Sequence, residues 1–190
     1  MSTYFHVDMA GRLEPGMRID LSPAKPSTFG LNYWRRFRNV GIRSIPSLQH
    51  IPSTANLLDE AAYREFYLEV VRTDHPEIST LPTVSRLNVF FAVGSLKDAE
   101  RYIERKQFRG RARIYEVHSQ GSPMKLDMNW LDHKFPRDIT LFGYYYIAYW
   151  RGLEMQNDPD IPGRPDRSTL WEVLLSSPVT IGSVVSEART

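Results

Sequence analysis

Glu172 is the residue whose surroundings most favour a chemical role. It lies between Trp171 and Val173 in an apolar run with the pattern of a strand. A carboxylate is rarely placed in such a run unless it faces a cleft or a partner, because burial of an unpaired charge is costly. Asp127, a few residues after Gly121, is a second candidate carboxylate, and a turn residue at a strand end is its alternative interpretation.

The sequence lacks the motifs of several common catalytic and metal-binding chemistries. The sequence has no cysteine, which excludes disulfides, thiolate zinc sites and a cysteine nucleophile. Its five histidines, at positions 6, 50, 75, 118 and 133, show no pair at the spacing of metal ligands on a helix, so we expect no bound metal. The glycine-rich phosphate loops GxGxxG and GxxxxGK[ST] and the GxSxG hydrolase elbow are also absent.

Length and charge indicate an ordinary globular chain. The 190 residues predict one domain over 1–190, and 24 basic against 22 acidic residues give a net charge of +2, too small to indicate a nucleic-acid partner by itself. No apolar run approaches the roughly 20 residues of a membrane span, and the N-terminus does not resemble a signal peptide. We therefore expect a soluble, cytoplasmic protein with no membrane partner.

The elements that would position these residues form a mixed pattern. Helices are predicted at 59–72, 96–106 and 138–153, and one or two helical turns at 32–38 inside the mostly irregular stretch 22–56. Strands are predicted at 3–8, 17–21, 87–93, 113–118, 123–127, 169–175 and 179–185, with 87–93 central in the sheet. Because strands and helices do not alternate regularly, the fold class is α+β rather than a doubly wound sheet.

Three segments, read in order, resemble the ADP-ribosyltransferase superfamily. Tyr4-Phe5-His6 followed by Leu13-Glu14-Pro15-Gly16 is similar to the first strand of the rifampicin ADP-ribosyltransferases. Residues 88–102 are similar to the strand–helix unit of the poly-ADP-ribose polymerases, in which an aromatic pair leads into a helix that ends in tyrosine. Residues 171–181 are similar to the Glu-Val-Leu segment that carries the catalytic glutamate of this superfamily.

The resemblance covers roughly residues 3–16, 86–128 and 168–185. It implies an ADP-ribosyltransferase-like split β-sheet core with flanking helices. It also implies an enzyme that uses NAD as a substrate, without a metal, and transfers ADP-ribose to an acceptor, which could be a protein, a nucleic acid or a small molecule. Such an enzyme would act as a bacterial toxin, effector or modifying enzyme in the cytoplasm of the producing or a target cell.

The resemblance also assigns roles to single residues. Cleavage of the nicotinamide–ribose bond passes through an oxocarbenium-like transition state, which a carboxylate near the ribose stabilises. Glu172 takes this catalytic role, and Asp127 ranks second because an acidic residue follows a similar strand–glycine turn in the rifampicin-modifying enzymes. The residues assigned to NAD binding are His6, Phe90, Tyr102 and Arg86.

Each binding assignment has a structural alternative. His6 could be a satisfied histidine at a sheet edge, and Phe90 could be core in a buried strand, where the family often has tyrosine. Tyr102 is in helical register with Asp98 and could simply pack half-buried, and Arg86 could be a surface arginine rather than a partner of the NAD pyrophosphate.

Two other functions remain open at the level of sequence. One is NAD hydrolysis, with water as the acceptor. The other is a non-catalytic module on the same fold that binds RNA or protein through the basic stretches Trp34–Arg38 and Arg105–Arg113. The alternative for these stretches is a solvated helix face with cations at a helix C-terminus.

Overall fold

The protein is described by a computed structural model that covers residues 2–22, 24–132, 139–159, 161 and 168–189. The chain divides into two compact units, a sheet unit (1–25, 89–125 and 170–190) and a helical unit (26–88 and 126–169). The chain crosses between the units four times, at 25/26, 88/89, 125/126 and 169/170, so no continuous stretch marks either unit in the sequence. The prediction of a single domain over 1–190 stays a prediction.

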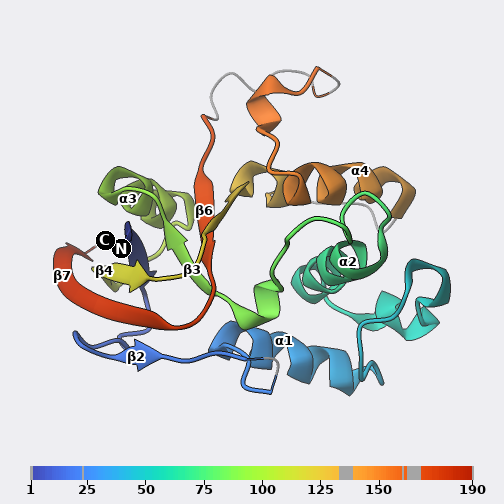
Figure 1. The fold of residues 1–190 in the computed structure, drawn as a ribbon, viewed down its shortest axis with the longest axis horizontal. Helices are drawn as coiled ribbons and strands as arrows, with labels where there is room; N and C mark the ends of the chain where they lie inside the picture. The colour runs from blue at the N-terminus through green and yellow to red at the C-terminus, as the bar shows by residue number, and fades with distance from the viewer. Residues whose placement is uncertain (1, 23, 133–138, 160, 162–167, 190) are drawn as a thin grey trace. The chain divides into compact units, whose positions relative to one another are not determined.

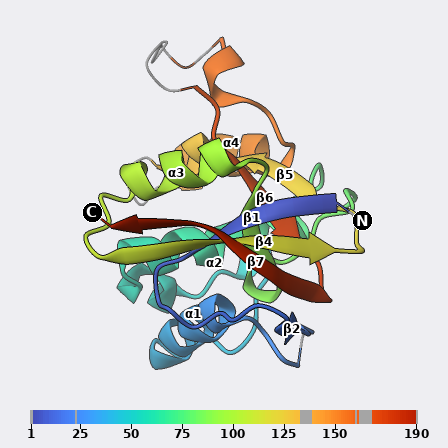
Figure 2. The same ribbon diagram turned by 90° about the vertical axis from the view of Figure 1, so that its left-hand side faces the viewer.

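The sheet unit is built on an antiparallel sheet (Figures 1 and 2). The strands of the sheet are β1 (Ser2–Asp8), β2 (Arg18–Ile19), β3 (Phe90–Val93), β4 (Arg111–Ser119), β5 (Met124–Asp127), β6 (Trp171–Leu175) and β7 (Val179–Arg189), and the last two residues of β5 are counted with the helical unit. They lie in the order β2-β7-β4-β1-β3-β6-β5. Strands distant in sequence are therefore neighbours, and β3 is an interior strand, as its apolar sequence predicts.

The two faces of this sheet carry separate apolar clusters, because successive side chains of a strand point to opposite faces. The first face buries Tyr4, Phe90, Ala92, Tyr115, Val117, Val173, Leu175, Val179 and Ile181, with Leu13, Ile19 and Leu21 packed against them. The second face includes Val93, Ala112 and Ile114 and is covered by helix α3 (Leu96–Arg105) through Ala99 and Ile103. Figure 2 shows α3 lying along this sheet.

The helical unit consists of three helices and five short 3₁₀ turns among its described residues. The helices are α1 (Thr28–Asn39), α2 (Glu60–Asp74) and α4 (Ile139–Trp150), and the turns are η1 (Leu48–His50), η2 (Ser53–Leu57), η3 (Arg86–Asn88), η4 (Met128–Leu131) and η5 (Met155–Asn157). Phe37 of α1 meets Phe66 of α2 edge to face, with ring centroids 5.5 Å apart. Trp150 of α4 donates its indole N–H to the carbonyl of Leu68 at 2.9 Å.

Side-chain caps explain where the helices begin. Ser27, Asp59 and Ser95 each accept a hydrogen bond from the backbone N–H three residues ahead, at the N-termini of α1, α2 and α3. Such a cap satisfies one of the backbone donors that the first turn leaves unpaired. Asp59 is therefore the cap of α2 rather than the first residue of its helix, as the predicted bounds 59–72 have it.

The observed elements confirm the α+β class and correct several boundaries. Helix α1 has twelve residues rather than one or two turns, and Arg86–Asn88 is a 3₁₀ turn rather than the start of strand β3. The predicted helix 138–153 is observed as Ile139–Trp150, and the predicted loop around 159–165 lies mostly outside the described residues. Within the described residues, no helix has the length and apolar content that a membrane crossing requires.

Candidate functional site

Three consecutive strands of the sheet bring the three resembling segments together. β1, β3 and β6 are neighbours in the sheet, and Val93 pairs with Phe5 on one side and with Glu172 on the other. Adjacent strands lie about 4.8 Å apart, so the backbones of Phe5 and Glu172 are separated by about 10 Å. Segments that are more than 160 residues apart in sequence thus meet within two strand spacings.

His6 joins β1 to β3 through its side chain. Its Nδ1 lies 2.7 Å from the carbonyl oxygen of Phe91, and its ring packs against Phe90 with centroids 4.5 Å apart. Because a carbonyl can only accept, Nδ1 carries the hydrogen and the lone pair of a neutral ring is on Nε2. Burial lowers the pKa of the His6 imidazole, which favours this neutral form at pH 7.

Glu172 lies on the other face of the sheet from these two rings. It is directly opposite Val93, which belongs to the face covered by α3, whereas its neighbour Val173 belongs to the face of Phe90. Only 4% of Glu172 is exposed. Strand alternation therefore separates the carboxylate of Glu172 from the rings of His6 and Phe90.

Phe91 is the aromatic residue that shares the face of Glu172. It pairs with Leu174, two residues along the same strand from Glu172, and it is only half-buried. Such diagonal neighbours on one face lie within reach of an aromatic side chain. Sequence reasoning chose Phe90 of this pair, and only the strand register could have distinguished the two.

Tyr102 belongs to the same side of the sheet, since it lies on α3. Ala99 and Ile103 of this helix pack on the second face, and Tyr102 is half-buried beside them, with the ammonium group of Lys106 5.5 Å from its ring centroid. The four predicted site residues of the sheet unit thus separate into two pairs. His6 and Phe90 lie in contact on the first face, and Glu172 and Tyr102 belong to the second.

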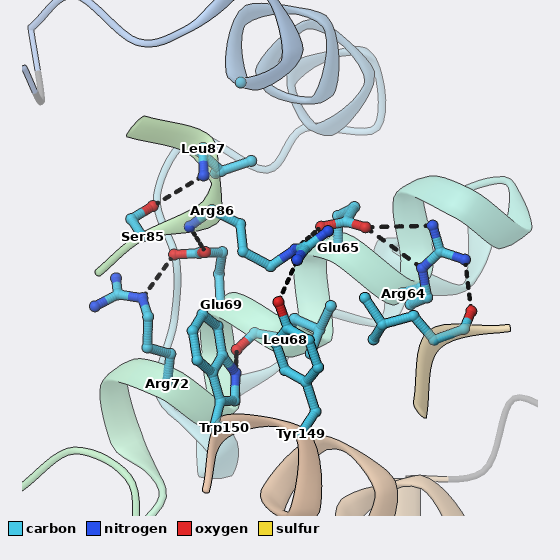
Figure 3. Close-up of polar contacts among 12 residues, drawn as sticks. Arg64, Glu65, Leu68, Glu69, Arg72, Ser85, Arg86, Leu87, Tyr149 and Trp150 are labelled. Atoms are coloured by element: carbon cyan, nitrogen blue, oxygen red, sulfur yellow. Dashed lines mark hydrogen bonds and ion pairs between the residues drawn. The ribbon is translucent and has the colours of Figure 1, made fainter. Parts of the chain in front are cut away.

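Arg86 is placed in the interior of the helical unit (Figure 3). It is 4% exposed, and its Nε donates to the carboxylate of Glu65 at 2.8 Å while one of its Nη atoms donates to the hydroxyl of Tyr149. Its guanidinium also lies over the Tyr149 ring, 5.3 Å from the centroid. Its charge is already compensated by a buried carboxylate, which favours a structural role, and the binding of a pyrophosphate by Arg86 stays a prediction.

A second buried glutamate holds the backbone of the same residue. Glu69, one helical turn after Glu65 on α2, accepts the backbone N–H of Arg86 at 2.8 Å and the Nε of Arg72 at 2.9 Å (Figure 3). Burial raises the pKa of Glu69, and the positive charge of Arg72 opposes that shift. Two successive turns of α2 therefore hold Arg86 by its side chain and by its main chain, which is a structural rather than a ligand-binding arrangement.

Asp127 is fully buried in the helical unit and acts as a cap. One carboxylate oxygen accepts the backbone N–H of Asn129 and the other that of Met155, both at 2.9 Å. These bonds tie the start of η4 to the start of η5. The structure therefore favours the turn interpretation of Asp127 over the catalytic one.

Comparisons with known proteins add no family assignment. The chain matches no protein-family model and no curated protein. Within the described part of the chain, no group of three or more histidine or acidic side chains could hold a metal ion. The functional argument consequently depends on the geometry of the sheet unit.

Proposed function

We propose that the protein is an NAD-dependent ADP-ribosyltransferase with the split-sheet fold that the sequence resemblance implies. The observation that carries this proposal is the adjacency of β1, β3 and β6, the three strands that contain the resembling segments. A further point in its support is that β1 and β3 pair through one residue pair in the described structure, Phe5 with Val93, which fits a sheet that opens between these strands.

Glu172 is the carboxylate that this chemistry requires. In the reaction the bond between C1′ of the ribose and the nicotinamide nitrogen breaks, and its electron pair leaves with nicotinamide. Glu172 would accept a hydrogen bond from the ribose 2′-hydroxyl and stabilise the positive charge that develops on the sugar. The acceptor then forms the new bond to C1′ and loses its proton to solvent.

The geometry suggests which rings would contact nicotinamide. Phe91 and Tyr102 belong to the side of Glu172, so we assign the nicotinamide contact to them in place of Phe90. Nε2 of His6 would accept a hydrogen bond from a hydroxyl of the second ribose. NAD would reach both faces where β3 ends, at Gly94, which is exposed and has open space at its Cα.

The test measures nicotinamide release from NAD, with and without candidate acceptors. Glu172→Gln should retain NAD binding, measured by calorimetry, and lose about 10²–10³ in turnover. Asp127→Asn is the contrasting variant, and because Asp127 caps two turns we expect lower thermal stability with unchanged turnover of the folded fraction.

Other outcomes would redirect or end the proposal. Release at the same rate without any acceptor would identify an NAD glycohydrolase. The absence of both binding heat and thermal stabilisation at millimolar NAD would refute either enzymatic function, since a ligand that binds the folded state must stabilise it.

A further inference from the structure

The helical unit begins with a stretch whose charged side chains are all basic. From Pro26 to Leu58 the sequence has four arginines, at 35, 36, 38 and 43, and no aspartate or glutamate. The whole chain has a net charge of only +2, so this stretch is the exception to a nearly balanced composition. A basic surface of this kind is the electrostatic signature that nucleic-acid phosphates recognise.

Helix α1 separates the aromatic and basic residues of this stretch. Tyr33 and Phe37 are 8% and 0% exposed and face the core of the helical unit. Arg35 and Arg38 are exposed, as are Asn32 and Asn39. The exposed residues recur at spacings of three and four, so guanidinium and amide groups share one solvent-facing stripe along the helix.

The four arginines of the stretch from Pro26 to Leu58 differ in whether an acidic side chain neutralises them. Arg36 forms an ion pair with Asp59 at 3.0 Å, which leaves its charge partly compensated. Arg35, Arg38 and Arg43 have no acidic partner among the described residues. The basic stretch at the end of α3 and the start of β4 differs, because Arg111 and Arg113 both pair with Glu187.

We propose that the exposed stripe of α1 binds double-stranded DNA, with Arg35 and Arg38 on phosphates or guanine edges and Asn32 and Asn39 within reach of base edges. The major groove of B-form DNA admits an α-helix, and arginine and asparagine are the side chains that most often read guanine and adenine there. The twelve residues of α1 give a helix about 18 Å long, which is enough to present this stripe to one groove.

The same stripe is less suited to other polyanions. Single strands are bound largely by stacking of bases on exposed aromatic rings, and no ring of α1 is exposed. Tyr33 and Phe37 are buried, and Phe29 and Trp34 are half-buried, with Trp34 against Phe37 at 5.5 Å. Duplex RNA has a major groove too deep and narrow for a helix. A membrane surface would require an apolar face, and Leu31 is the one large apolar side chain exposed on α1.

The test is fluorescence anisotropy of a labelled 20-base-pair DNA duplex, titrated with the full chain at several salt concentrations. If Arg35 and Arg38 both contact phosphates, the slope of log affinity against log salt should be about −2. Arg35→Glu with Arg38→Glu should weaken binding at least about tenfold and reduce the slope by about 2. The matched control is Lys97→Glu with Arg109→Glu, two exposed cations of the sheet unit, which should leave binding unchanged.

The proposal is overturned if the control variant loses as much affinity as the α1 variant, since binding would then follow net charge alone. It is equally overturned if single-stranded RNA of the same length binds and the duplex does not, or if vesicles with anionic lipids bind more tightly than the duplex. Because both α1 substitutions are on exposed positions, melting temperature should not change. Nicotinamide release in the absence of DNA is measured in parallel, so a failure of the enzymatic proposal is distinguishable from a failure of this one.

Discussion

Asp8 in the sheet unit and Glu65 in the helical unit are both buried carboxylates, but they are compensated in different ways. Asp8 accepts the backbone N–H groups of Ala10, Arg12 and Leu13 at 2.8–2.9 Å, all within five residues of itself. Glu65 is compensated by Arg86, twenty-one residues away. A buried charge must find a partner in either case, and the distance along the chain decides whether a local turn or the tertiary fold depends on it.

The two kinds of compensation also differ in their electrostatic outcome. Burial alone would raise the pKa of the Asp8 carboxyl, but the backbone N–H groups of Leu13, Ala10 and Arg12 lower it overall. In the arginine-bound cluster, burial dominates and the pKa of Glu69 is raised despite Arg72. The direction of each pKa shift therefore depends on whether the hydrogen bonds and charges at the carboxylate outweigh its loss of water.

The largest loss of stability is expected when the buried cluster of Arg86, Glu65, Glu69 and Arg72 is disrupted. Arg86→Met should lower the free energy of unfolding by about 3–5 kcal/mol, because it leaves the buried Glu65 without its main partner. Urea denaturation measures the loss. The double variant with Glu65→Leu should recover much of it, since an apolar pair avoids the unpaired charge. If the single variant is as stable as the wild type, this cluster does not support the tertiary fold of the helical unit.

A close backbone approach in the same unit should be the next most sensitive point. A Cβ at Gly30 of α1 would lie 1.9 Å from the carbonyl oxygen of Leu87, so Gly30→Ala should destabilise by about 2 kcal/mol although alanine usually favours a helix. Gly143→Ala on α4 is the matched control, because its Cβ would meet nothing within 4 Å, and it should be neutral or stabilising. Equal results for the two variants in thermal unfolding would contradict the contact of α1 with η3.

The local compensation is tested by Asp8→Asn, for which we expect a loss of about 1–2 kcal/mol at pH 7. The folded pKa of Asp8 lies below its unfolded value of about 3.9, so its stabilisation is complete above that pH and is lost as the pH falls through the folded pKa. The difference between wild type and variant should therefore shrink in acid. A difference that grows below pH 4 would show that the carboxylate does not act through its charge.

The smallest effect is expected for an exposed ion pair of the helical unit. Arg36→Ala removes the pair with Asp59, in which both side chains are more than a third exposed, and should cost less than about 1 kcal/mol. Asp59→Ala should cost more, since Asp59 also caps α2 through the N–H of Ala62. Chemical denaturation of the two variants separates the cap from the ion pair, and equal losses would argue that the cap is unimportant.

The sequence alone determined the elements whose cause is local. Helix α3 was predicted within one residue, because Ser95 caps it and its apolar residues recur at helical spacing. Strand β1 and the short strand β5 were also predicted within one residue. The extent of α1 was missed although Ser27 caps it and Phe29, Tyr33 and Phe37 recur at helical spacing, because the stretch 22–56 around it is rich in turn residues.

The sequence names the residues of the candidate site but does not define how they are arranged. Apolar surroundings were sufficient to single out Glu172, whereas the adjacency of β1, β3 and β6 is seen only in the strand order of the sheet. Whether Phe90 or Phe91 shares the face of Glu172 depends on strand register, which a one-residue shift would reverse. Arg86 was assigned to a ligand because its partners, Glu65 and Tyr149, are 21 and 63 residues away in the chain and only the tertiary fold brings them into contact.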